Sequence, residues 1–186
     1  MGKVLYSMMV SLDGCIEDRD GSIEFSAPDP EVHRMANQQA HEASAMLFGR
    51  RMYEAMEEPW TAAARKDDLP EVEAEFARIY LATPRFVFSD TLREVPAGVQ
   101  LVRSDEAVAT VERLKRDSEG DLDLGGAGLA ASLLDLVDEF RLYVMPVLVG
   151  GGKPYYPVGA GQLRLRLAEQ RSFASGAVYL RYEREG

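Results

Sequence analysis

Four glycine-centred segments, each directly after a short apolar run, are the residues of this chain best suited to binding a ligand. They are Ser11-Leu12-Asp13-Gly14, Gly49-Arg50-Arg51, Gly125-Gly126-Ala127-Gly128 and Gly150-Gly151-Gly152. Glycine lets a backbone approach a flat ligand or a phosphate closely. Because α/β sheets bind ligands beyond the carboxyl ends of their strands, this recurring position predicts a binding edge.

Arg50 and Arg51 follow Gly49 at the expected start of a helix, an arrangement that binds anions. Helix N–H groups and the helix dipole point at such a ligand, and arginine adds fixed positive charge. Adjacent arginines are informative here because the chain has 31 acidic and 21 basic residues and a formal charge of -10. A solvated basic pair on the surface is the alternative.

The other segments also have two interpretations each. Gly125 to Gly128 departs from the G-x-G-x-x-G fingerprint, so it suits either a diphosphate cradle or a turn needed for close packing. Asp13-Gly14 suits a loop lying against a ligand or a plain turn. The glycines from 150 to 152 by themselves indicate only that a strand ends in a flexible loop.

The sequence lacks the residues that several classes of function require. The sequence has no G-x-S-x-G, H-E-x-x-H or P-loop motif. Cys15 is the single cysteine and His33 and His41 are the two histidines, so we expect no metal site. The negative charge disfavours nucleic acid and anionic membranes. With no apolar run near 18 residues and no secretory signal pattern, we expect a cytoplasmic protein.

The elements that must position these segments alternate between strand and helix, which favours a mostly parallel sheet. We expect buried strands at 3–10 and 45–48 and a polar loop over 11–27. A helix should follow Asp29 as N-cap and Pro30 at the first position. Further helices are expected at 50–57, 70–80, 104–114 and 129–137, and strands at 85–89, 99–102, 121–124 and 140–149. Alternation over 163–167 and 178–182 predicts a closing antiparallel hairpin.

Taken in this order, the segments resemble the dihydrofolate reductase superfamily, especially the reductase domain of the bacterial riboflavin-biosynthesis deaminase-reductase. The resemblance rests on Ser11 to Gly14, Gly49-Arg50-Arg51-Met52-Tyr53-Glu54, Val87 to Leu92, Gly125 to Leu129 and Pro146 to Pro154. It covers nearly the whole chain. It implies one α/β domain over 1–186, with a mixed, mostly parallel sheet, flanking helices and a C-terminal antiparallel hairpin.

The resemblance also implies a cofactor, NADPH, with NADH as a possible substitute. It places Arg50 and Ser89 at the adenosine 2′-phosphate, and Arg51 with Gly49 at the diphosphate. Gly125, Gly126, Ala127 and Gly128 would cover the diphosphate. Leu12 and Gly14 would lie near the nicotinamide, and Asp13 closest to the substrate, as the catalytic residue that supplies or relays a proton.

The sequence departs from the family at informative positions. Cys15 stands where the riboflavin-pathway domain has lysine, and Asp90 stands where relatives have arginine. We therefore expect an NAD(P)H-dependent reductase of a small pterin-like, pyrimidine-like or carbonyl substrate, and a homodimer. The alternatives are a non-catalytic NADPH-binding module and an interaction protein that reuses the fold.

Overall fold

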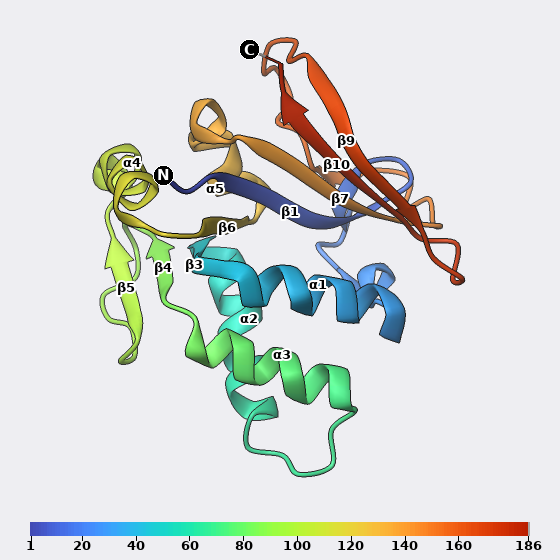
Figure 1. The fold of residues 1–186 in the computed structure, drawn as a ribbon, viewed down its shortest axis with the longest axis horizontal. Coiled ribbons are helices and arrows are strands. Elements are labelled where there is room, and N and C mark those ends of the chain that lie inside the picture. Colours follow the sequence, from blue (N-terminus) through green and yellow to red (C-terminus); the bar gives the residue numbers. More distant parts are fainter. Residues whose placement is uncertain (186) are drawn as a thin grey trace.

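The computed structural model describes residues 1–185 and contains an eight-stranded sheet with helices on both faces (Figure 1). The strand order is β5-β4-β3-β6-β1-β7-β10-β9, in which the first six strands are parallel and β10 pairs antiparallel with both β7 and β9. The predicted fold class is confirmed. The strands of this sheet are β1 (Val4–Ser11), β3 (Ala43–Gly49), β4 (Arg85–Phe88), β5 (Val99–Val102), β6 (Asp121–Gly125), β7 (Glu139–Met145), β9 (Leu165–Ser172) and β10 (Val178–Arg184).

One face of the sheet is covered by α1, with α2 and α3 packed beside it, while α4 and α5 lie on the opposite face (Figure 1). The helices are α1 (Pro30–Glu42), α2 (Arg50–Ala63), α3 (Glu71–Ala82), α4 (Ala107–Asp117) and α5 (Ala127–Ser132). Three short 3-10 turns, at Glu24–Ser26, Ser104–Glu106 and Leu134–Leu136, join these elements. The two layers of helices bury the sheet on both sides, as parallel strands require.

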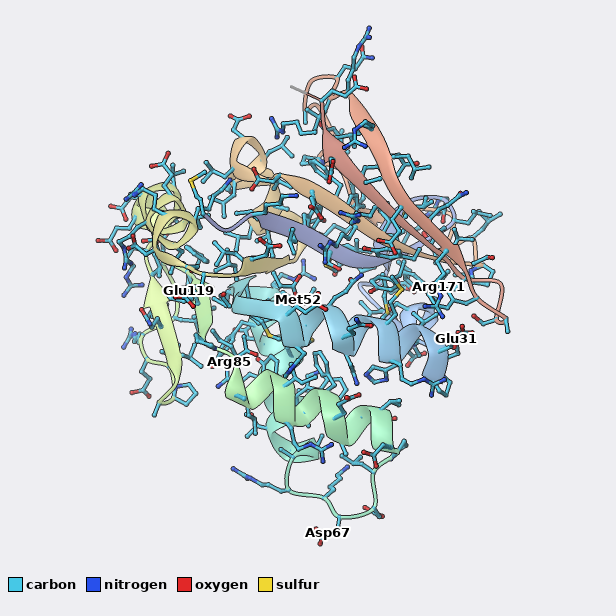
Figure 2. All side chains as sticks on the ribbon, viewed as in Figure 1. Glu31, Met52, Asp67, Arg85, Glu119 and Arg171 are labelled. Atoms are coloured by element: carbon cyan, nitrogen blue, oxygen red, sulfur yellow. The ribbon has the colours of Figure 1, made fainter. Side chains whose placement is uncertain are left out.

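The start of α1 follows the predicted capping chemistry. The Asp29 carboxylate accepts hydrogen bonds from the amides of Glu31 (2.7 Å) and Val32 (3.2 Å), and Pro30 occupies the first turn. Glu31 also pairs with Arg171 of β9 at 2.8 Å, and Figure 2 shows the two side chains together where the hairpin meets the helix. The cap and this ion pair fix the amino end of α1 against the sheet.

Strand β1 occupies the middle of the sheet, between β6 and β7. Its Tyr6 lies in register with Leu124 on one side and Phe140 on the other. The Tyr6 and Tyr155 rings stack with centroids 4.2 Å apart, and each hydroxyl donates to the other residue's carbonyl oxygen at 2.9 Å. This reciprocal pair holds the segment after β7 against the centre of the sheet.

Two predicted boundaries on the N-terminal side are wrong. The expected loop over 11–27 contains strand β2 (Cys15–Asp18), which pairs antiparallel with β8 (Gly152–Pro154) in a separate two-stranded sheet. The pairing is non-local, so local polarity gave no sign of it. Helix α2 continues to Ala63 through Pro59, because Trp60 packs edge-on against Phe76 of α3 at 4.5 Å.

Three further boundaries also differ from expectation. Strand β7 ends at Met145, directly before Pro146, which has no N–H for the sheet. Helix α5 begins at Ala127, so the tight turn is limited to Gly125 and Gly126. Strand β9 starts two residues later than predicted and runs on to Ser172, because β10 pairs with it along its whole length.

Candidate active site

A pocket of about 740 Å³ opens at the carboxyl edge of the sheet and runs inward between the sheet and helices α1 and α2. This volume lies in the range of small-molecule sites. Its outer end is lined by the starts of α2 and α5 and by β8, and its inner end by α1 and by residues of β1, β3, β6 and β7. The predicted binding edge therefore leads into a half-open cleft.

The outer end of the pocket contains positively charged side chains and backbone N–H groups that no side chain caps. Gly49, Arg50 and Arg51 line the pocket at the start of α2, where no side chain caps the helix N–H groups. Arg50 pairs with Glu54 at 3.1 Å on the exposed helix surface, and Arg51 with Glu17 at 3.4 Å. Both arginines are held loosely by carboxylates that an incoming anion can replace. This end suits a phosphate group.

Gly125, Gly126 and Gly128 line the same end. Gly126 has a φ of +98°, and a Cβ there would lie 3.1 Å from the Cβ of Met52. Gly128 has an ordinary backbone, and a Cβ there would meet only the Lys153 amino nitrogen, at 3.9 Å. The backbone conformation and the contact with Met52 therefore explain why residue 126 is glycine. At Gly128 neither reason applies, and the space beside Lys153 is open to a ligand.

The inner end contains a carboxyl group that the sequence analysis did not single out. Asp123 of β6 lines the pocket, and burial raises its pKa from 3.8 to about 6, against the opposing pull of Arg141. Arg141 is engaged by Glu139 at 2.9 Å. Nearby, the Tyr143 hydroxyl donates to Gln39 Oε1 at 2.7 Å across the gap between β7 and α1. Perturbed carboxyl groups in clefts mark functional sites.

Asp13 lies outside the pocket lining. Its carboxylate accepts hydrogen bonds from the amides of Val149 (3.1 Å) and Gly150 (2.8 Å). The Ser11 hydroxyl and these amides lower the pKa of Asp13 to about 2. Such a group is ionised at neutral pH and holds two loops together. This arrangement favours a structural role over the predicted proton transfer.

We expect Asp13→Asn to weaken the contact between the Asp13 loop and the loop at Val149 and Gly150, and to leave turnover largely unchanged. The depressed pKa means that the carboxylate contributes stability above its unfolded value of 3.8, and that this contribution is lost as pH falls through about 2. The variant should show a lower Tm at pH 7 and faster amide exchange at Val149 and Gly150. A loss of turnover without either change would instead favour the catalytic role.

The remaining predicted residues form the surroundings of the pocket. Leu12 is 63% exposed, and its amide donates to Val147, while Gly14 makes a turn with φ of +80°. Ala127 is buried beside the glycine turn. The Ser89 hydroxyl accepts hydrogen bonds from two amides of its own loop, those of Thr91 and Leu92. Of this group, none lines the pocket in the described part of the chain.

The family model for the RibD C-terminal domain matches residues 2–179. The chain belongs to this family. RibD C-terminal domains have the α/β fold seen here, and the resemblance drawn from the glycine segments is confirmed.

Individual relatives extend the comparison. The uncharacterized protein YyaP of Bacillus subtilis (strain 168) is 28% identical over 99% of this chain and 96% of its own length. A deaminase/5-amino-6-(5-phosphoribosylamino)uracil reductase of Thermotoga maritima has a TM-score of 0.70 at 17% identity, over 99% of this chain and 57% of that one. RibD of Acinetobacter baumannii gives 0.71 at 19%, over 100% and 58%. The chain thus matches part of each of these two structures.

Within residues 1–185 no group of three or more His, Cys, Asp and Glu side chains is placed to hold a metal ion. In the same part of the chain no helix is both long and apolar enough to cross a bilayer.

Proposed function

We propose that this RibD-type domain is an NADPH-dependent reductase that delivers a hydride to a small heterocyclic, imine or carbonyl substrate. The observation that carries the proposal is one pocket with two unlike ends. The outer end has arginines, a lysine and a glycine backbone that a ligand can approach closely, and the inner end has a half-buried carboxyl group with a pKa raised to about 6. Family membership supports the same reaction class.

The outer end fits the phosphates of a dinucleotide. Arg51, Lys153 and the uncapped start of α2 would hold the diphosphate, and Gly128 gives it room. Arg50 at the mouth would hold the 2′-phosphate. When bound, the cofactor supplies a hydride, and the protein contributes position and electrostatics.

The inner end supplies the proton that must accompany the hydride. Asp123, with a pKa of about 6, keeps its proton in roughly a tenth of molecules at pH 7 and in about half at pH 6. Its O–H can be transferred to a ring nitrogen or carbonyl oxygen as the neighbouring carbon is reduced. Ala36 and Ala40 of α1 form an apolar wall beside this end of the pocket.

A binding measurement and a turnover assay test the proposal separately. NADPH should bind with a fluorescence change, and a panel of pterins and pyrimidines should consume it, measured by absorbance near 340 nm. Binding without consumption of NADPH by any compound would favour the non-catalytic module. The absence of NADPH binding would favour an interaction protein on the same fold.

We expect Arg50→Ala to reduce the preference for NADPH. Losing a charge-assisted contact to the 2′-phosphate should weaken NADPH binding about 10-fold and leave NADH binding nearly unchanged. Arg51→Ala is the matched control, because a diphosphate contact is shared and both cofactors should weaken together. An unchanged NADPH:NADH ratio in Arg50→Ala would place the 2′-phosphate elsewhere.

Asp90 also affects the proposed preference for NADPH over NADH. Its carboxylate accepts a hydrogen bond from the Ser104 amide at 2.9 Å, which ties the loops after β4 and β5 together. The Ser104 contacts lower the pKa of Asp90, so the group is ionised at neutral pH. Where relatives have arginine, this charge opposes a phosphate, and the preference for NADPH should be smaller than in those relatives.

A homodimer remains part of the proposal. Strand β9 is the edge of the large sheet and is mostly exposed, with Leu167 at 44%. Exposed strand edges need covering, and a second copy is the simplest partner. Light scattering with size-exclusion chromatography would give the mass, and a monomer at all concentrations would reject the dimer.

A further inference from the structure

The lining of the pocket is rich in methionine. Five of the eight methionines in the chain line it: Met8, Met9, Met46, Met52 and Met56. Met9 and Met46 come from strands at the inner end, whereas Met8 and Met52 contact the glycine turn at Gly126. Phe48 and Phe76 lie in the same lining. Thioether sulfur is polarizable and packs favourably against aromatic rings, and the unbranched side chain adapts to rings of different outline. This lining therefore suits a flat conjugated ring.

The positively charged side chains of the pocket lie at its outer end. In the part of the chain that the structure describes, the cationic residues of the pocket lining are Arg50, Arg51 and Lys153. Arg50 and Arg51 follow the end of β3, and Lys153 reaches the space beside Gly128. All three lie where the proposed function puts the cofactor phosphates. A substrate phosphate would find these groups already engaged.

The polar groups at the inner end also disfavour an anion. Asp123 lies two residues inside the carboxyl end of β6, in register with Met46, well within the strand. Arg141, the cation that acts on it, is committed to Glu139. The Tyr143 hydroxyl is donated to Gln39, so Tyr143 presents oxygen lone pairs rather than a free donor. A neutral N–H group fits beside Asp123, whereas a phosphate would meet a carboxyl group with no cation to offset the repulsion.

We propose that the substrate is a flat heterocycle without a phosphate group, packed between methionine side chains and bonded through an N–H to Asp123. The proposal rests on the reductase function and narrows it. It separates this chain from the Thermotoga maritima reductase, which is named for a phosphoribosylamino substrate.

A matched pair of ligands tests the proposal. The probes are 5-amino-6-(5-phosphoribosylamino)uracil and the same compound without its phosphate, each titrated calorimetrically into protein saturated with NADP⁺. We expect the unphosphorylated compound to bind at least about 10-fold more tightly, the size of one unfavourable charge contact. Equal or tighter binding of the phosphorylated compound would overturn the proposal. So would failure of both compounds to bind.

Two variants give the test an internal check. Met56→Lys places a cation in the pocket lining one helical turn beyond Met52 and should reverse the order of the two affinities, while Met56→Gln, of similar length but neutral, should keep it. If Met56→Lys leaves the order unchanged in a folded protein, charge does not set the selectivity and the proposal is wrong. NADP⁺ binding, measured in the same preparations, distinguishes this failure from failure of the reductase function.

Discussion

Asp123→Asn is expected to lower kcat at least about 100-fold, with NADPH affinity changed little. An amide cannot supply the proton that the buried carboxyl group holds, and general acid catalysis contributes about 10²–10⁴-fold to rate. The measurement is NADPH consumption with the best substrate from the panel, beside direct NADPH titration. Asp121→Asn is the matched control, because Asp121 is on the same strand but outside the pocket lining.

The pH dependence separates this role from a merely structural one. Wild-type kcat should fall as pH rises through about 6, where Asp123 loses its proton, and the asparagine variant should lack that limb. Retention of the same limb in Asp123→Asn would assign the proton to another group. An unchanged kcat would remove Asp123 from the reaction.

The same variant should be more stable than the wild type at pH 7 to 8. The folded pKa of about 6 lies above the unfolded value of 3.8, so the carboxyl group favours folding below about pH 4 and loses that contribution as pH rises through 6. A shift of this size corresponds to about 1–3 kcal/mol of unfolding free energy. Denaturant unfolding at pH 5 and pH 8 should show that the difference in unfolding free energy between Asp123→Asn and the wild type is larger at pH 8. A substitution that raises stability and lowers turnover is characteristic of a residue retained for function.

Gly128→Val is expected to weaken NADPH binding at least about 10-fold while the protein without cofactor stays as stable as the wild type. The added side chain would fill the space beside Lys153 in which the diphosphate is proposed to lie, and its only near neighbour is a flexible amino group at 3.9 Å. Within α5, valine is also a better helix residue than glycine, by a few tenths of a kcal/mol. NADPH titration and thermal unfolding check the two halves of the prediction.

Gly161→Val is the control, because a Cβ added to this glycine would have no heavy atom within 4 Å and the residue lies outside the pocket lining. Gly126→Val would be a poorer experiment. Its φ of +98° and the contact with Met52 make unfolding the expected result, so lost binding would carry no information. If Gly128→Val binds NADPH normally, the diphosphate lies elsewhere.

The predicted residues that do line the pocket are those whose position follows from local order along the chain. A glycine or arginine directly after a buried strand must lie at the carboxyl edge of a parallel sheet, and Gly49, Arg50, Arg51 and Gly128 do line the pocket. The cap at Asp29 is equally local, since the carboxylate bonds amides two and three residues away.

Asp13 and Asp123 show what local order cannot predict. Asp13 has the right place in the chain, but its side chain turns to a loop more than a hundred residues later. Asp123 alternates with Leu122 and Leu124, a pattern typical of a strand with one face in water. That face is instead covered by α1, and only the folded chain places the aspartate in the lining of a pocket.

The central place of β1 has a consequence for how the protein is made. Strand β1 leaves the ribosome well before its partners β6 and β7, which begin at residues 121 and 139. At about 5–20 residues per second, synthesis delays those partners by roughly 6–25 s. Meanwhile β3, β4 and β5 can already pair with one another. During that interval β1, which is largely apolar, has neither of its neighbours in the sheet, so we expect it to be the strand most exposed to aggregation while the chain is being made.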